Sequence, residues 1–224
     1  MTFSIVARCA ETGMFGVAVA SSSPAVAARC AYARAKVGAI ASQNITDPTL
    51  GPRGLDLMAQ GAAATEALET LCRTGAHIRY RQILMVDGRG ATAVYSGPQA
   101  LGIYGDASGD QVACGGNLLS SPEIPGIMVA AFTKASGHLG DRLLAAMQAA
   151  LAAGGEAGPI HSAGIKLVDE VSWPVADLRV DWTEGDPVGE LADLWRRYTP
   201  QLDDYVTRAL DPTAAPSYGV AGDE

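Results

Sequence analysis

The sequence is short of the residues on which several classes of binding site depend. Its 224 residues include only three lysines and three histidines, and the formal net charge is −8. Nucleic acids and anionic membranes bind clusters of lysine and arginine, so this composition argues against both partners. His77, His138 and His161 lack metal-ligand spacing. We therefore expect no metal, no other cofactor and no nucleic-acid partner.

Long apolar segments and paired cysteines are missing as well. No apolar run reaches the roughly 18 residues of a membrane-spanning helix, and no basic and apolar leader opens the sequence. The four cysteines, Cys9, Cys30, Cys72 and Cys114, show no C-x-x-C spacing, and a domain of this size folds without disulfides. We expect a cytoplasmic protein with free, buried thiols and no membrane partner.

The sequence does contain enough apolar residues for one large core. Hydrophobic residues make up 48% of the chain and charged residues 18%, which is typical of a single globular domain of this length. We expect that domain over residues 1–211. The segment from Pro212 onward, residues 212–224, is expected to be a flexible tail.

Short strands joined by hairpins, and helices arriving in pairs, are predicted along the domain. Strands are expected at residues 2–8, 14–21, 37–43, 81–86, 91–96, 110–114, 163–169 and 176–181. Helices are expected as a pair that starts at Pro52 and breaks near Gly61, a second pair at 121–135 and 139–153, and a long helix from Asp186 to Leu210.

This order of elements favours stacked sheets. Alternating strand-helix-strand units are absent, which argues against a doubly wound parallel fold. The stretch from Met14 to Ala20 is apolar on both faces, so this strand should be buried on both sides. The sequence therefore predicts an α+β protein, a four-layer αββα sandwich of two mainly antiparallel sheets.

Thr2 is the first candidate for chemistry. If Met1 is removed, the freed α-amino group, with a pKa of about 7.7 to 8, can act as general base for the threonine hydroxyl. One residue then supplies both nucleophile and base. The alternative is that threonine is simply common in strands.

Ser21 and Ser22 stand at the end of the second expected strand. In an antiparallel hairpin this end lies beside the start of the first strand, so their hydroxyls should approach Thr2 and orient its amine or contact the substrate. The alternative is a polar strand end that caps the following turn.

Lys36 and Arg53 are the candidate charged groups. A lysine near Thr2 would lower the pKa of the hydroxyl and assist catalysis, and Arg53 could bind a substrate carboxylate through two hydrogen bonds. A solvated lysine at a strand start and an arginine at a surface helix start are the alternatives.

A glycine-rich segment, Gly115-Gly116-Asn117, directly follows an expected strand. Glycines allow a backbone to approach a ligand, and an asparagine amide can donate to a developing oxyanion, so we expect Asn117 to be catalytic and both glycines to lie at the substrate. The alternative is a turn with a left-handed asparagine. Gln43 and Asn44, at the end of another strand, are expected to contact substrate in the same cleft.

Three segments carry a family resemblance. Thr2–Arg8, Gly16–Ser21 and Gly51–Leu57 resemble the bacterial domain-of-unknown-function family DUF1028, whose fold is like that of the N-terminal-nucleophile (Ntn) hydrolases, and the likeness extends to about Tyr198. The resemblance implies an Ntn-hydrolase-like sandwich and a nucleophile at Thr2. Lys36 stands where the family often has glycine, so the resemblance does not support it as a shared catalytic position.

Two classes of function follow. The first is an amidohydrolase that acts on a small amide or cyclic imide, in which the Thr2 amine takes the hydroxyl proton and Asn117 or nearby backbone N–H groups hold the oxyanion. The second is a non-catalytic protein that binds a small molecule or peptide, or assembles, through the same cleft. A hydrolase with an internal nucleophile, such as Ser21 or Cys114, is a third possibility. The helix at 139–153 or the Trp195 face could support a homodimer.

Overall fold

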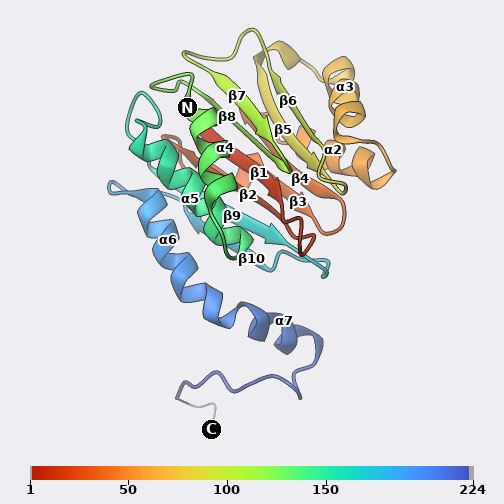
Figure 1. The fold of residues 1–224 in the computed structure, drawn as a ribbon, viewed down its shortest axis with the longest axis vertical. Coiled ribbons are helices and arrows are strands. Elements are labelled where there is room, and N and C mark those ends of the chain that lie inside the picture. The colour runs from red at the N-terminus through yellow and green to blue at the C-terminus, as the bar shows by residue number, and fades with distance from the viewer. Residues whose placement is uncertain (1, 222–224) are drawn as a thin grey trace.

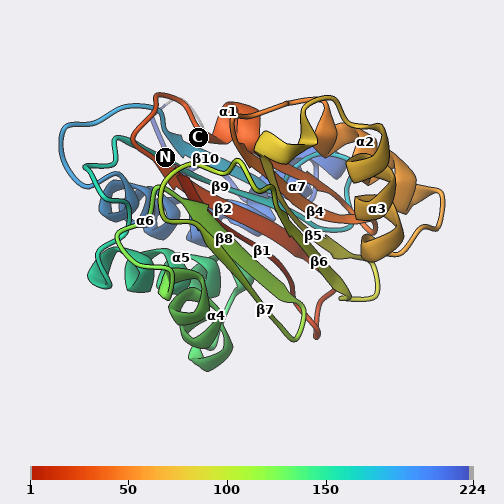
Figure 2. The same cartoon turned by 90° about the horizontal axis from the view of Figure 1, so that it is seen from above.

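The computed structural model describes residues 2–221, and within them two antiparallel sheets pack face to face (Figure 1, Figure 2). The larger sheet contains β1 (Thr2–Arg8), β2 (Phe15–Ser21), β7 (Gly105–Gly109), β8 (Val112–Asn117), β9 (Ser162–Val168) and β10 (Ala176–Val180). The smaller sheet contains β3 (Ala31–Arg34), β4 (Gly38–Asn44), β5 (Arg81–Asp87) and β6 (Thr92–Ser96). The spatial orders are β10-β9-β2-β1-β8-β7 and β3-β4-β5-β6.

Helices cover the outer face of each sheet. They are α2 (Leu50–Ala59), α3 (Ala64–Thr74), α4 (Ile124–Lys134), α5 (Leu139–Ala152) and α6 (Pro187–Tyr198). The one-turn helix α1 (Ala27–Cys30) instead packs into the cluster between the sheets, and α7 (Leu202–Leu210) follows α6. One apolar cluster joins the larger sheet to α4, α5 and α6, a second lies between the sheets, and a third joins the smaller sheet to α2 and α3. The predicted four-layer αββα sandwich is confirmed.

The central strand β1 is paired on both sides. Phe3, Ile5 and Ala7 belong to the apolar cluster under α4 and α5, whereas Val6 belongs to the cluster between the sheets. Because side chains alternate along a strand, Thr2 shares the inner face with Val6. Antiparallel pairing brings the start of β1 beside the ends of β2 and β8. The first described residue of the chain therefore lies at one edge of the interior.

The structure adds two strands that the sequence analysis missed, and it divides one helix. β3 has four residues and follows a one-turn helix, while β7 is an edge strand with glycine at both ends; neither has the apolar alternation that predicts a strand. The predicted long helix from Asp186 is interrupted by a 3₁₀ turn at Thr199–Gln201, which contains Pro200.

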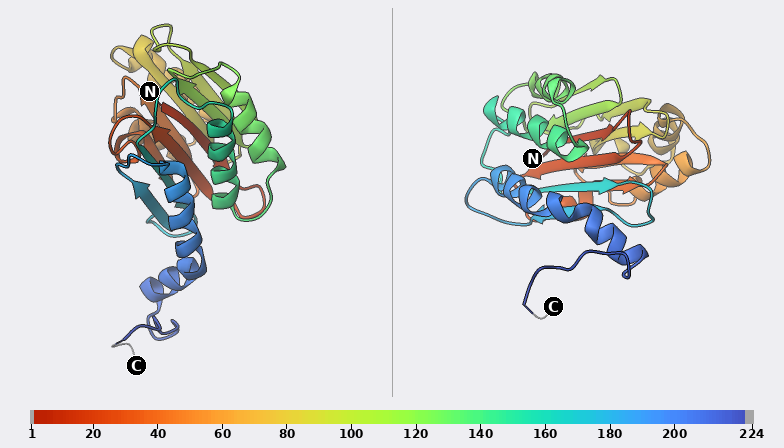
Figure 3. Two further views of the ribbon diagram at one scale, coloured as in Figure 1. Left: turned by 90° about the vertical axis from the view of Figure 1, so that its left-hand side faces the viewer. Right: turned by 60° about the horizontal axis from the view of Figure 1, so that its bottom comes forward.

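The C-terminal part of the chain leaves the sandwich. α7 and the segment after it extend away from the two sheets (Figure 1, Figure 3). Arg208 of α7 donates hydrogen bonds to the carbonyls of Pro216 and Ser217 in the expected tail and stacks on the Tyr218 ring. Residues 222–224 of that tail, and Met1, lie outside the described residues. No helix in the described part of the chain has the length and apolar character needed to cross a bilayer.

Candidate functional site

Four polar residues form a row across one end of the larger sheet. Thr2 opposes Asn117 of β8, and Ser21 opposes Ser162 of β9. The register of β1 with β2 places Thr2 opposite Ser21. Side chains at opposed positions of neighbouring strands share a face, so the row Ser162-Ser21-Thr2-Asn117 faces the second sheet. All four residues are buried, with Thr2 at 5% exposure.

A chain of hydroxyl groups connects Thr2 to a cation. Thr2 Oγ1 lies 3.4 Å from Ser21 Oγ, and Ser21 Oγ lies 2.8 Å from Ser23 Oγ. Arg29 of α1 donates to Ser23 Oγ at 2.6 Å and also to two backbone carbonyls of the preceding turn. The predicted proximity of Ser21 to Thr2 is therefore present. Arg29 was missed because no motif marks it in the alanine-rich stretch.

Two buried glutamines join the sheets beneath this row. Ser4 donates to Gln43 Oε1 at 2.6 Å, and Gln43 Nε2 donates to Gln82 Oε1 at 2.8 Å. Gln82 Nε2 donates to Ser96 Oγ at 2.9 Å and to two carbonyl oxygens of β7 and β8, each at 3.1 Å. These bonds satisfy groups that burial would otherwise penalise. Gln43, which was predicted to contact substrate, is committed to this internal network.

The network also orients the side chain of Asn117. Its Nδ2 lies 3.4 Å from Gln82 Oε1, and its Oδ1 is buried with no hydrogen-bond partner among the described residues. Three acceptors surround Gln82 Nε2, so Gln82 Oε1 must face Asn117, and this oxygen can only accept an N–H. The unused atom of Asn117 is therefore an acceptor. That atom fits an N–H of a bound molecule, whereas the predicted donation to an oxyanion would use the second N–H of Nδ2.

Glu156 is a further site residue that the sequence analysis missed. It lies between α5 and β9, is 5% exposed, and accepts hydrogen bonds from the Ser22 N–H at 3.3 Å through both carboxylate oxygens. Its backbone forms a bridge with Leu119, two residues after Asn117. Burial raises the pKa of Glu156 to about 7, although the N-terminal ammonium and the Ser22 hydrogen bonds act in the opposite direction. Ser22 itself is only partly buried.

Lys36 and Arg53, the two predicted charged residues, lie outside the row that contains Thr2. Lys36 precedes β4 at the end of the sandwich opposite Thr2, is exposed, and pairs with Glu170 at 2.6 Å. Arg53 lies on the exposed side of α2, where it donates to Thr74 Oγ1 at 2.7 Å. The prediction that Lys36 assists the nucleophile is therefore wrong, whereas the prediction that Arg53 binds a substrate carboxylate stays a prediction. Both side chains have the solvated surface positions that were the alternatives.

The two glycines before Asn117 lie inside β8, not in a turn after it. A Cβ on Gly115 would come 2.9 Å from a methyl group of Leu84, and one on Gly116 would come 2.6 Å from a methyl group of Leu119. Close packing of side chains explains both glycines. The expectation that they follow the strand is therefore wrong, as is the alternative of a turn, while their place at the substrate stays a prediction.

Asn44 anchors a loop beside the row instead of lining it. Its Oδ1 accepts the N–H of Leu101 at 3.2 Å, and its Nδ2 donates to the carbonyl of Tyr80, just before β5. The anchored loop and the residue after Asn44 form an apolar rim of exposed side chains, at 38–47% exposure: Ile45, Leu101, Ile103 and Tyr104. The carbonyls of Leu101 and Ile103 accept the N–H groups of the two residues after Asn117. The rim therefore borders the Thr2 end of the sheet.

Comparison with known proteins identifies the family. The model of a family of unknown function, DUF1028, matches residues 2–191. The chain belongs to this family. The predicted family resemblance is thus confirmed. Among curated proteins, none matches the sequence.

Solved structures also resemble this DUF1028 member. Protein SPO2555 from Silicibacter pomeroyi, of the same family, matches with a TM-score of 0.82 and 29% identity, over 88% of this chain and 89% of that chain. Two Anbu (ancestral β-subunit) structures match at lower similarity. The protein from Yersinia bercovieri has a TM-score of 0.39 and 9% identity over 91% and 97% of the two chains, and a Gly-1 mutant from Hyphomicrobium sp. strain MC1 has 0.41 and 10% over 90% and 96%.

The thiol considered as an internal nucleophile lies on the wrong face. Cys114 is fully buried in the cluster beneath the helices, with Ile5, whereas Thr2 faces the second sheet. Burial raises the pKa of the Cys114 thiol well above its usual value. A protonated, inaccessible thiol is a poor nucleophile. No group of three or more metal-ligating side chains occurs among residues 2–221.

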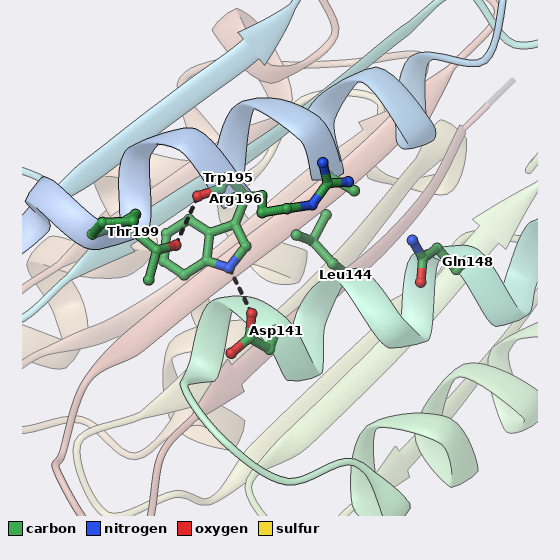
Figure 4. Close-up of a pocket in the computed structure, with 8 residues that line it drawn as sticks. Asp141, Leu144, Gln148, Trp195, Arg196 and Thr199 are labelled. Atoms are coloured by element: carbon green, nitrogen blue, oxygen red, sulfur yellow. Dashed lines mark hydrogen bonds between the residues drawn. The ribbon is translucent and has the colours of Figure 1, made fainter.

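A separate hollow of about 460 Å³ lies between α5 and α6 (Figure 4). Trp195 Nε1 donates to Asp141 Oδ1 at 2.7 Å there, and Thr199 Oγ1 donates to the Trp195 carbonyl. The Trp195 ring is 3% exposed and packs on Gly140. The Trp195 ring is thus packed within the chain, and the homodimer through this face or the 139–153 helix stays a prediction.

Proposed function

We propose that this DUF1028 member is an N-terminal-nucleophile amidohydrolase whose nucleophile is Thr2, exposed by removal of Met1. The observation that carries the proposal is the position of Thr2. It starts the central strand of an αββα sandwich, on the inner face, between a serine hydroxyl and an asparagine amide. Removal of one residue would leave a free amine beside the hydroxyl of the same residue. Such an amine can act as its general base.

The chemistry follows from this pairing. The neutral Thr2 amine takes the hydroxyl proton while Oγ1 attacks the amide carbonyl, and the resulting ammonium protonates the leaving nitrogen as the C–N bond breaks. Water then hydrolyses the ester to release the acid and restore the hydroxyl. Ser21, 3.4 Å from Thr2 Oγ1, orients that hydroxyl. Stabilisation of the oxyanion is assigned to nearby backbone N–H groups or to the second N–H of Asn117 Nδ2.

The surroundings of Thr2 favour a small substrate that carries both an N–H and an apolar group. Asn117 Oδ1 is an unpaired buried acceptor in register with Thr2, and an N–H of the substrate would satisfy it. The apolar rim borders the same end of the sheet. Amides and cyclic imides with an apolar substituent meet both requirements.

The test uses protein in which Thr2 is the first residue, confirmed by intact mass. Exposure to a β-lactone should add one acyl group, which peptide mapping should place on Thr2. Thr2→Ala should abolish the adduct and Thr2→Ser should retain it. Thr46→Ala, which removes a hydroxyl near Cys30 instead, should behave as wild type. A Thr2-first protein that acquires no adduct on Thr2, or an adduct that survives Thr2→Ala, would overturn the proposal.

One observation favours the second class of function. Thr2 is only 5% exposed, which limits the access of a substrate to its hydroxyl. A binding protein would use Asn117 Oδ1 and the apolar rim to hold the same amides without cleaving them. Thermal stabilisation by an amide that is recovered intact, together with an unlabelled Thr2, would establish that alternative.

A further inference from the structure

Glu156 is a buried carboxylate for which the hydrolytic steps above have no role. Its position follows from the topology. β1 lies between β2 and β8, and it starts where those two strands end. Glu156 contacts the chain just beyond both ends: its carboxylate accepts the N–H of Ser22, after β2, and its backbone pairs with Leu119, after β8. It therefore spans the start of β1.

We propose that Glu156 binds and orients the α-amino group of Thr2 once Met1 has been removed; this rests on the proposed function. A carboxylate at the start of β1 can accept one N–H of the amine. That bond would restrict rotation of the amine and direct its lone pair toward the Thr2 hydroxyl. Glu156 would thus be a positioning residue, whereas the amine and hydroxyl of Thr2 react.

The charges around Glu156 support this pairing. Arg29 is already bound to Ser23 and two backbone carbonyls, and the His161 ring stacks on Trp182. Glu123, on the segment after Leu119, is exposed. With Met1 still in place, the N-terminal ammonium already acts to lower the pKa of Glu156, against the larger effect of burial. A buried carboxylate needs a cation or several N–H donors, and a freed N-terminal amine supplies both.

The segment that carries Glu156 is held firmly enough to position an amine. Ser120 N–H donates to the Gly155 carbonyl at 3.0 Å, and the N–H of Ala157 donates to the Leu118 carbonyl at 2.9 Å. These two bonds flank Glu156 and tie its segment to the chain that follows β8. The carboxylate is therefore fixed relative to β8, and through β8 to Thr2.

The test measures the pKa of the α-amine in Thr2-first protein by competitive acylation across a pH range, with the N-terminal peptide quantified by mass spectrometry. Glu156→Gln keeps the shape and removes the charge, so we expect it to lower the amine pKa by about 1, because an adjacent carboxylate favours the ammonium. Glu156→Asp keeps the charge and should remain closer to wild type than Glu156→Gln. Glu123→Gln is the matched control and should leave the amine pKa unchanged.

The pH dependence of β-lactone acylation at Thr2 is measured on the same samples. Its inflection should move to lower pH in Glu156→Gln together with the amine pKa. An amine pKa that is equal in wild type and Glu156→Gln, or that shifts equally in the Asp and Gln variants, would overturn the role of Glu156 even if Thr2 is labelled. A shifted amine pKa with no labelling of Thr2 would instead reject the hydrolase and retain the amine-carboxylate pair.

Discussion

In protein that retains Met1, substitution of Glu156 by glutamine should stabilise the fold at alkaline pH. The pKa of this carboxyl rises from the usual 4.5 to about 7 because the group is buried. The folded state therefore binds more protons than the unfolded state between these two values, and wild-type stability falls as pH rises through that window. At about 1.4 kcal/mol per pKa unit, the cost of the buried charge reaches about 3 kcal/mol above pH 8 and about 1 kcal/mol at pH 5.5. Glu156→Gln removes this cost and keeps an acceptor for the Ser22 N–H.

Urea unfolding of both proteins at pH 5.5 and pH 9 measures the difference. The variant should gain about 2 kcal/mol over wild type between the two pH values, or about 4–8 °C in Tm for a chain of this size. Glu123→Gln, at an exposed carboxyl, should show no such divergence. A gain that is the same at both pH values, or a wild type that is the more stable protein at pH 9, would refute the reasoning.

Three further substitutions test the interior of the site. Gln82→Met should lower the free energy of unfolding by about 3 kcal/mol or more, measured by urea unfolding, because the acceptors around its amide lose their donor; a neutral effect would show that the network is not needed. Arg29→Met should slow β-lactone acylation of Thr2 about tenfold through loss of a charged hydrogen bond to Ser23, and an unchanged rate would separate Arg29 from the site. Lys36→Ala should leave that acylation rate unchanged and alter stability by less than about 0.5 kcal/mol; slower acylation would restore Lys36 as a candidate.

The layers of the fold could be predicted because burial leaves a pattern in the sequence. β2 is apolar on both faces and is buried at all seven positions, as a strand between a sheet and a helical layer must be. β7 could not be predicted in this way. Its sequence, Gly-Asp-Ala-Ser-Gly, has no alternation of apolar and polar residues. It forms a strand because it pairs with the edge of β8.

The site was predictable only where chain topology alone determines proximity. A hairpin places Ser21 beside Thr2 whatever the rest of the chain does. Glu156 lies more than 130 residues from Ser22 in the sequence. The Gly-Gly-Glu segment alone does not indicate whether its carboxylate is buried or exposed, because that depends on how the loop packs in the folded protein. Lys36 was misplaced for a related reason: the position of β4 relative to β1 depends on contacts between the sheets, which the sequence does not show.

The register of β1 determines where the amine that is freed by removal of Met1 will lie. β1 is paired with β2 and β8 along its whole length, so its side chains cannot move to the opposite face without breaking both ladders. A shift of one residue would turn Thr2 toward the helices and place Phe3 between the sheets. The amine exposed by loss of Met1 is consequently confined to the edge that Glu156 spans, beside Ser21 and Asn117. Pairing on both sides thus positions a terminal residue as firmly as an internal one, which a nucleophile at the start of a chain requires.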